Sequence, residues 1–132
     1  MSISDPPRHA TEFDGWISAE FATHGAFTAL VILVHIDATR VNPLTSTFFH
    51  VISDDTDWGE ISLLFDGSGA DWDGASFFPV RTRGGALLDN ATARQALQGL
   101  MARLGEDRLV LNEGRFFDKW GRQLKVEEVP SQ

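Results

Sequence analysis

The sequence predicts an α+β fold, in which a mostly antiparallel sheet of five to seven strands carries one main helix on one face. Three observations support this prediction. Short segments rich in Val, Ile and Phe are separated by short turns, and short turns favour antiparallel pairing. Only residues 89–104 show a sustained helical period. The strand segments follow one another as a meander, whereas a parallel sheet needs helices between its strands.

The chain divides into a tail and a domain. Residues 1–10 contain two consecutive prolines and few apolar side chains, which is typical of a flexible tail. We expect a single domain over residues 11–129, because a chain of 132 residues has the usual size of one domain.

Residues 11–25 fit two secondary structures. Thr11 followed by Asp14 is typical of a helix N-terminus, and Gly25 suits a helix end. Apolar residues at positions 17, 19 and 21 also alternate as in a strand, and Gly15 disfavours a helix. We interpret the segment as a strand, with the helix as the alternative.

Residues 26–36 give the clearest strand. Val and Ile dominate and both faces are apolar, which predicts a central position in the sheet. Asn42-Pro43 predicts a turn, and residues 46–53 predict the next strand, again apolar on both faces.

Two more strands are expected before the helix. Residues 59–66 alternate between apolar and polar side chains, which predicts a strand with one face toward solvent. A loop rich in Gly and Asp covers residues 66–74, and residues 75–82 form the following strand. Pro79 cannot donate to a ladder, so this strand is expected at an edge or with a bulge.

The helix over residues 89–104 has capping and periodicity signals. Asp89 or Asn90 can cap its N-terminus, and an apolar stripe with a period of 3.6 residues follows. Residues 108–112 and 122–129 are expected to complete the sheet.

Paired phenylalanines indicate a sheet that is apolar on both faces. Neighbouring residues of a strand point to opposite faces, so each pair needs cover on both. One helix covers one face, and the other is left to the N-terminal segment, sheet curvature, a ligand or another protein. An exposed apolar face is typical of an interface. The candidate binding residues are these aromatic side chains and two loop tryptophans, namely Phe48, Phe49, Trp58, Trp72, Phe77 and Phe78.

Composition excludes several classes of function. The chain has no Cys and no Tyr, which excludes disulfides, Cys-based zinc sites and Tyr acid–base chemistry. The formal net charge of −8 argues against nucleic acids and anionic membrane surfaces as partners. The polar N-terminus lacks the apolar core of a signal peptide, so we expect a cytoplasmic protein.

The charge is unevenly distributed along the chain. Residues 1–80 contain twelve acids and two bases, net −10, and residues 81–132 contain seven acids and nine bases, net +2. No base lies between Arg40 and Arg81, whereas seven acids do. These acids either keep loops solvated or form a surface for a basic partner.

No catalytic or nucleotide-binding motif is present, so a non-catalytic role without a cofactor is favoured. Asp66, Asp71 and Asp73 crowd one loop and are the candidate metal ligands. Their spacing does not fit a calcium loop, because Ala70 and Phe77 occupy ligand positions. We therefore expect no metal.

His35, Asp37 and His50 are the candidate catalytic residues. His35 and Asp37 share one face of the strand at 26–36, and His50 lies on the next strand. If His35 faces Phe48, the two imidazoles are diagonal neighbours that can share a proton or a metal. A register change of one residue places His50 on the opposite face and removes the site.

Arg81 and Arg83 are candidate anion ligands. They lie on the same side of a strand end, next to a Gly-Gly turn, which suits a carboxylate or phosphate. The alternative is ordinary ion pairing with the acidic loops.

These patterns favour a small acidic, non-catalytic protein-binding module, such as a regulator, inhibitor or immunity-type factor, that acts through an apolar sheet face and acidic loops. The expected partner is another protein, or a second copy in a homo-oligomer. Neither a nucleic acid nor a membrane is expected. The alternative is a small-ligand-binding or enzymatic pocket that uses His35, His50, Asp37 and the Arg81/Arg83 pair.

Overall fold

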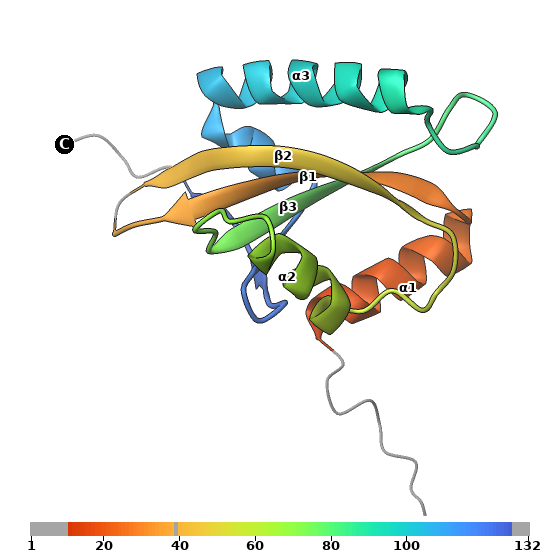
Figure 1. Ribbon diagram of the computed structural model, residues 1–132, viewed down its shortest axis with the longest axis horizontal. Coiled ribbons are helices and arrows are strands. Elements are labelled where there is room, and N and C mark those ends of the chain that lie inside the picture. The colour runs from red at the N-terminus through yellow and green to blue at the C-terminus, as the bar shows by residue number, and fades with distance from the viewer. Residues whose placement is uncertain (1–10, 39, 128–132) are drawn as a thin grey trace, which may run out of the picture.

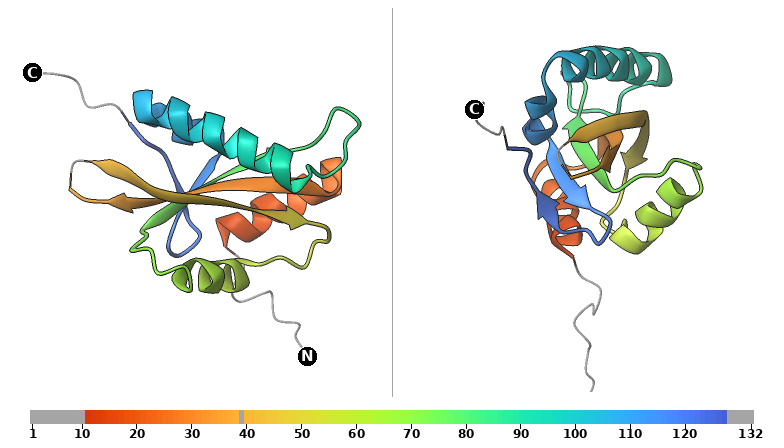
Figure 2. Two further views of the ribbon diagram at one scale, coloured as in Figure 1. Left: turned by 45° about the horizontal axis from the view of Figure 1, so that its top comes forward. Right: turned by 90° about the vertical axis from the view of Figure 1, so that its left-hand side faces the viewer.

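The structure, a computed structural model, describes residues 11–38 and 40–127. One five-stranded antiparallel sheet has the order β2-β1-β3-β4-β5 and carries helices on both faces (Figures 1 and 2), which confirms the predicted α+β class. The elements in chain order are α1 (Glu12–His24), β1 (Phe27–Ile36), β2 (Val41–Val51), α2 (Trp58–Asp66), β3 (Gly74–Val80), α3 (Asn90–Glu106), the 3-10 helix η1 (Arg108–Glu113), β4 (Arg115–Asp118) and β5 (Gln123–Leu124). The expected tail at residues 1–10 lies outside the described residues. In the described part, no helix has the length and apolar character needed to cross a bilayer.

Helix α1 occupies residues that were expected to form a strand, so that interpretation is wrong. Thr11 Oγ1 accepts a hydrogen bond from the Asp14 N–H (3.1 Å), and Asp14 Oδ2 accepts one from the Thr11 N–H (2.9 Å). This reciprocal cap satisfies donors that the first turn leaves free. Gly25 ends the helix with a φ of 79°, and Phe13 and Ile17 are buried. The cap and one apolar face therefore outweigh the alternating pattern.

Helix α2 replaces the strand expected at residues 59–66, and that prediction is wrong as well. Asp57 precedes the helix and its Oδ1 accepts a hydrogen bond from the Glu60 N–H (2.9 Å). The buried side chains Trp58, Ile61 and Phe65 are spaced by three and four residues, as on one helix face. Ile61 and Phe65 fit both periods, but Leu63 between them points away from the core and is 71% exposed.

The β1–β2 hairpin places β2 at the edge of the sheet. β1 is largely buried and lies between β2 and β3, as its sequence predicts. β2 begins at Val41, so Asn42 and Pro43 lie in the strand and the expected turn there is wrong. The pairing with β1 shifts register between Leu33 and Val34, opposite this segment. An edge strand tolerates Pro43 because its outer side needs no donor.

Strand β3 is internal, contrary to its expected edge position. It pairs with β1 on one side and with β4 on the other. The β4 partners end at Phe77, and Pro79 has its partner, Ala29, in β1. The proline therefore lies beyond the part of β3 that has two neighbouring strands, where a missing N–H is tolerated.

In the C-terminal half, the predicted helix forms, whereas the two predicted strands differ from expectation. α3 matches the predicted helix, and the Asp89 carboxylate caps it by accepting a hydrogen bond from the Thr92 N–H (2.7 Å), which lowers the pKa of Asp89. Residues 108–112 form η1 rather than a strand. The strand expected at 122–129 is reduced to β5, and residues 128–129 lie outside the described part.

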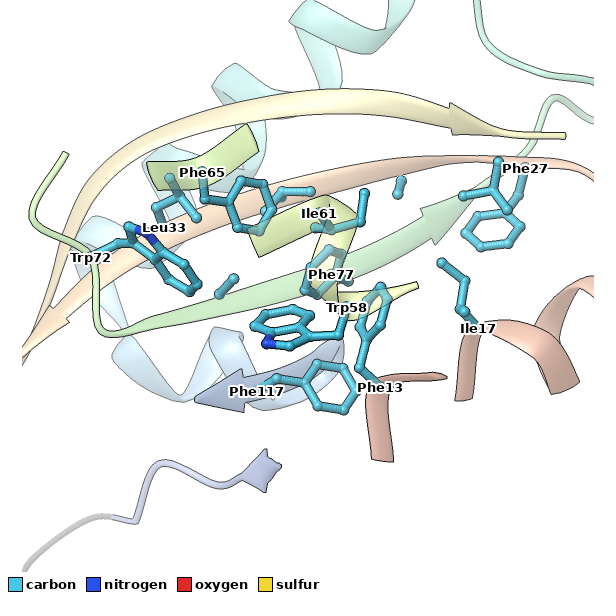
Figure 3. Packing of buried hydrophobic residues seen from close by; sticks show 14 residues of the cluster. Phe13, Ile17, Phe27, Leu33, Trp58, Ile61, Phe65, Trp72, Phe77 and Phe117 are labelled. Carbon is cyan, nitrogen blue, oxygen red and sulfur yellow. The ribbon is translucent and has the colours of Figure 1, made fainter. Parts of the chain in front are cut away.

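Two apolar layers enclose the sheet. The three Phe-Phe pairs lie in β2, β3 and β4, and each pair divides between the layers, as alternation requires. The layer beneath α1 and α2 contains Phe77 and Phe117, which Figure 3 shows, and Phe49 packs against it; the layer beneath α3 and η1 contains Phe48, Phe78 and Phe116. Both faces are thus covered by the chain itself, and the expected open sheet face is not present in the described residues.

Candidate functional site

The candidate histidine pair is not formed. His35 lies opposite Asn42, and His50 lies opposite Thr28 at the other end of the hairpin. Seven residues along β1 separate the two positions, which is about 23 Å at a rise of about 3.3 Å per residue. His50 Nδ1 instead lies 3.0 Å from Thr28 Oγ1. The register in which His35 faces Phe48 does not occur, so the two histidines are not placed to share a proton or a metal.

The candidate acids of the 66–74 loop have separate roles. Asp66 accepts a hydrogen bond from Trp72 Nε1 (2.9 Å), and Asp73 accepts one from the Ile36 N–H (2.7 Å). His35 Nδ1 lies 2.8 Å from Asp73 Oδ2, without hydrogen-bond geometry. Asp71, another candidate ligand, is exposed, with its Oδ2 4.0 Å from the same Nδ1. Across residues 11–38 and 40–127, no group of three or more His, Asp or Glu side chains is placed to hold a metal ion.

Asp37 lies at the turn of the β1–β2 hairpin and does not approach His50. Its Oδ1 accepts a hydrogen bond from the Arg40 N–H (2.9 Å), and its own N–H donates to the Arg40 carbonyl (3.0 Å). These bonds close the turn that connects β1 to β2. The candidate catalytic residues therefore occupy both ends of one hairpin rather than one site.

The two candidate anion-binding arginines have different environments. Arg81 donates to the Gly25 carbonyl (2.9 Å), to the Ala26 carbonyl (3.2 Å) and to Glu20 Oε2 (3.0 Å). Its guanidinium also lies 5.0 Å from the centre of the Phe27 ring. Through these hydrogen bonds, Arg81 connects the end of α1 to the sheet. Arg83, by contrast, is exposed. The pair does not form an anion clamp.

Replacing Arg81 by Gln is expected to lower the free energy of unfolding by about 1–2 kcal/mol. The change removes charged hydrogen bonds to two carbonyls and leaves the Glu20 carboxylate without its cation. Urea unfolding followed by tryptophan fluorescence measures the loss. Arg83→Gln is the control and is expected to change stability by less than about 0.5 kcal/mol. Equal effects of the two substitutions would contradict this role of Arg81.

Three of the six candidate aromatic binding residues belong to the core. Trp58, Trp72 and Phe77 are buried, so neither candidate tryptophan is open to a partner. Trp58 Nε1 donates to the Lys119 carbonyl (2.7 Å), which satisfies its polar atom inside the core. The other candidates, Phe48, Phe49 and Phe78, are half-buried.

A groove between β2 and α2 remains as the apolar surface open to a partner. Its volume is about 410 Å³. The buried residues Leu33 and Phe65 form its base, at one end of the cluster in Figure 3. Leu64 of α2 forms one wall and is 63% exposed. The residues lining the groove are Leu33, Thr45, Ser46, Thr47, Phe48, Phe49, Leu64, Phe65 and Ser68.

The groove runs beside an open strand edge. β2 is the outermost strand, and its outer edge has no partner strand in the described part of the chain. Proteins commonly protect such edges with charged side chains or proline. The segment from Val41 to Val51 has no Asp, Glu, Lys or Arg, and its one proline is Pro43 near its start.

The region around the groove is acidic. Residues 41–80, which include β2, α2 and β3, contain seven acids and no Lys or Arg. Six of the acids are exposed, and they lie before, within and after α2: Asp54, Asp55, Asp57, Glu60, Asp66 and Asp71. These six residues, which we call the acidic surround, belong to or adjoin the elements that form the groove, and none of them lines the groove itself.

Two other hollows are less suited to a specific partner. The larger, of about 920 Å³, lies between the β1–β2 turn, the end of α3 and residues 125–127 and is lined by charges of both signs. One of its cations, Arg108, already donates to the Val41 carbonyl (3.0 Å). The other is a shallow surface beside the exposed Trp120, which lies under the Arg122 guanidinium.

Comparison with known proteins gives no assignment, since no protein-family model, curated protein or solved structure matches the chain. The site therefore rests on its geometry alone. Sequence reasoning missed Leu63 and Leu64, although one signal was available. Two adjacent leucines in a nine-residue helix that already buries Trp58, Ile61 and Phe65 cannot both reach the core.

Proposed function

We propose that the chain is a small acidic, non-catalytic protein-binding module of the cytoplasm that binds its partner at the surface formed by β2 and α2. One observation carries this proposal: an eleven-residue edge strand is open beside an apolar groove. Exposed Leu63 and Leu64 extend the apolar surface over α2. Contiguous apolar surface with a polar rim is typical of protein interfaces.

The sheet faces do not serve this role, because the chain covers both of them. The binding surface is therefore the edge and its groove rather than the face that the phenylalanine pairs suggested. The acidic surround increases the rate of association with a basic protein. A regulator, inhibitor or immunity-type factor is a role that needs such a surface and no catalytic group.

The alternative of a ligand or enzymatic pocket gains no support from the arrangement of its polar groups. Its polar groups, His35, His50 and Arg81, lie at separate places and bond to different elements. A functional pocket needs convergent polar groups around one cavity.

The proposal is tested by comparing proteins cross-linked in a lysate of the source organism to wild type, to the double variant Leu63→Gln/Leu64→Gln, and to Leu109→Gln. Leu109 is an exposed leucine of η1 and serves as the matched control. We expect at least one protein that wild type and the control capture and the double variant does not. This protein, once purified, binds wild type at least about tenfold more tightly than the double variant. Identical captured sets for all three chains contradict the proposal.

A further inference from the structure

On the basis of the proposed function, we infer that the partner presents a basic extended segment that is apolar at every second residue over its middle, carries Lys or Arg at both ends, and pairs with β2 as a sixth strand. Its apolar side chains enter the groove beside α2, and the Lys and Arg side chains at its ends are attracted to the acids near the ends of β2 and α2. Three properties of the surface, namely pairing, shape and charge, support this inference.

The first property is the regular part of the open edge. From Thr45 to Val51, β2 pairs with β1 without a register shift, whereas the shift and Pro43 lie at its other end. Seven residues span about 23 Å, which suits a partner strand of similar length. An edge offers outward N–H and C=O groups at alternate residues, and an extended peptide satisfies them by strand addition.

The second property is the position of the groove relative to that edge. Phe49 packs with the apolar layer beneath α1 and α2, so Thr47 and Thr45 point to the same face by alternation. The groove is on this face, between these side chains and Leu64. A strand added to β2 directs every second side chain toward α2. An apolar residue there covers Leu64 and closes the groove.

The third property is charge, which distinguishes a foreign segment from a second copy of this chain. Residues 41–80 carry seven acids and no Lys or Arg in each copy, and the whole chain has a net charge of −8. Pairing β2 with β2 of another copy brings two acidic regions together, and like charges oppose this contact. A segment with Lys or Arg at its ends is attracted to the same region.

The acids lie where such a segment passes. Asp54 and Asp55 follow the end of β2, Asp57 and Glu60 begin α2, and Asp66 ends it. Arg81, the first base after Arg40, is held by Glu20. No cation between residues 41 and 80 therefore competes with the partner for these carboxylates.

The test uses a synthetic peptide of about nine residues in which Val and Thr alternate at the centre and Lys residues stand at both ends, with three matched peptides. In one, Glu replaces Lys; in another, alternate backbone N–H groups are methylated; in the third, the central Val and Thr residues stand in blocks. Fluorescence anisotropy with the full chain measures binding. We expect this Lys/Val peptide to bind at least about tenfold more tightly than each matched peptide. Raising salt from about 0.02 to about 0.3 M is expected to weaken binding about tenfold.

Two substitutions on α2 locate the binding site. Leu64 lines the groove, whereas its equally exposed neighbour Leu63 does not. Leu64→Gln is expected to weaken the Lys/Val peptide about tenfold, and Leu63→Gln by less than about twofold. Hydrogen exchange of the amides from Thr45 to Val51 is expected to slow when the peptide binds, because outward N–H groups become bonded.

Four outcomes overturn the inference: equal binding of the N-methylated peptide, equal binding of the Glu peptide, no effect of Leu64→Gln, or a dimer that forms through β2 in light scattering. Each of them leaves the proposed function standing if a protein is still captured in a manner that depends on Leu63 and Leu64. Loss of that capture contradicts the proposed function itself. A failure of the inference and a failure of the proposed function are therefore distinguishable.

Discussion

Replacing Phe77 by alanine is expected to lower the free energy of unfolding by about 3–5 kcal/mol. Phe77 is fully buried in the centre of the layer beneath α1 and α2. Its ring packs against aromatic rings from both helices and from β4, with centroid distances of 4.9 Å to Phe13, 6.0 Å to Phe65 and 5.9 Å to Phe117. Alanine removes these contacts and leaves a cavity that the surrounding elements only partly fill.

The adjacent residue provides the matched control. Phe78 belongs to the same strand and faces the other layer, where it is half-buried. Phe78→Ala is expected to have less than about half the effect of Phe77→Ala, because less apolar area is lost from the interior. Urea unfolding of both variants measures the difference. Should Phe77→Ala prevent folding, Phe77→Leu gives a smaller loss that is still greater than that of Phe78→Leu. A larger loss at Phe78 contradicts the burial described for β3.

The features that the sequence predicted correctly depend on short-range rules. The phenylalanine pairs divide between two layers because alternation is a property of any strand, whatever its neighbours. α3 is predictable because Asp89 caps it and seventeen residues sustain one apolar stripe. β1 is predictable because a strand of Val and Ile that is apolar on both faces belongs inside a sheet.

The two short helices were missed because their apolar residues fit both periods. In α2, Ile61 and Phe65 are separated by four residues, which is one helix face and also one strand face. The Asp57 cap and the contact of Trp58 with the core decide the matter. The cap is a local signal that the sequence contains, whereas the burial of Trp58 depends on the fold and cannot be read from a window of nine residues.

The candidate site was not predictable because strand order and register are long-range properties. The histidine pair required a register in which His35 faces Phe48, whereas the chain turns between Ile36 and Val41 and pairs His35 with Asn42. The shift of six positions separates the two histidines. Likewise, Pro79 predicted that β3 is an edge strand, but β3 is internal. The long edge strand is β2, which contains Pro43.

Because two segments predicted as strands are helices, the expected binding surface lies at a different place. When residues 12–24 and 58–66 are helices, they cover the sheet face that a single helix left open. Two strongly exposed apolar side chains, Leu63 and Leu64, lie on α2 itself, and Leu64 lines the groove beside the edge strand β2. The surplus of apolar surface inferred from the sequence is therefore located at an edge, where main-chain groups as well as side chains can contribute to binding.

Replacing Gly114 by alanine is expected to lower the free energy of unfolding by about 3 kcal/mol, at the upper end of the range for overpacking. Gly114 lies between η1 and β4, where a Cβ atom would clash with the Phe77 carbonyl oxygen and lie 2.9 Å from ring carbons of Phe78. The φ of −98° is accessible to any residue, so the loss comes from the close approach of backbone segments. The carbonyl belongs to β3 and can move only together with the sheet.

Gly99→Ala is the matched control and is expected to act in the opposite direction. Gly99 is in α3, and a Cβ atom there has no neighbour within 4 Å. Alanine in a helix interior is favoured over glycine by about 0.5–1 kcal/mol, so the variant should unfold at a higher urea concentration than wild type. Opposite shifts of the two midpoints support the close packing of β3 against the η1–β4 junction. A neutral Gly114→Ala variant contradicts it, and with it the position of the layer that holds Phe78.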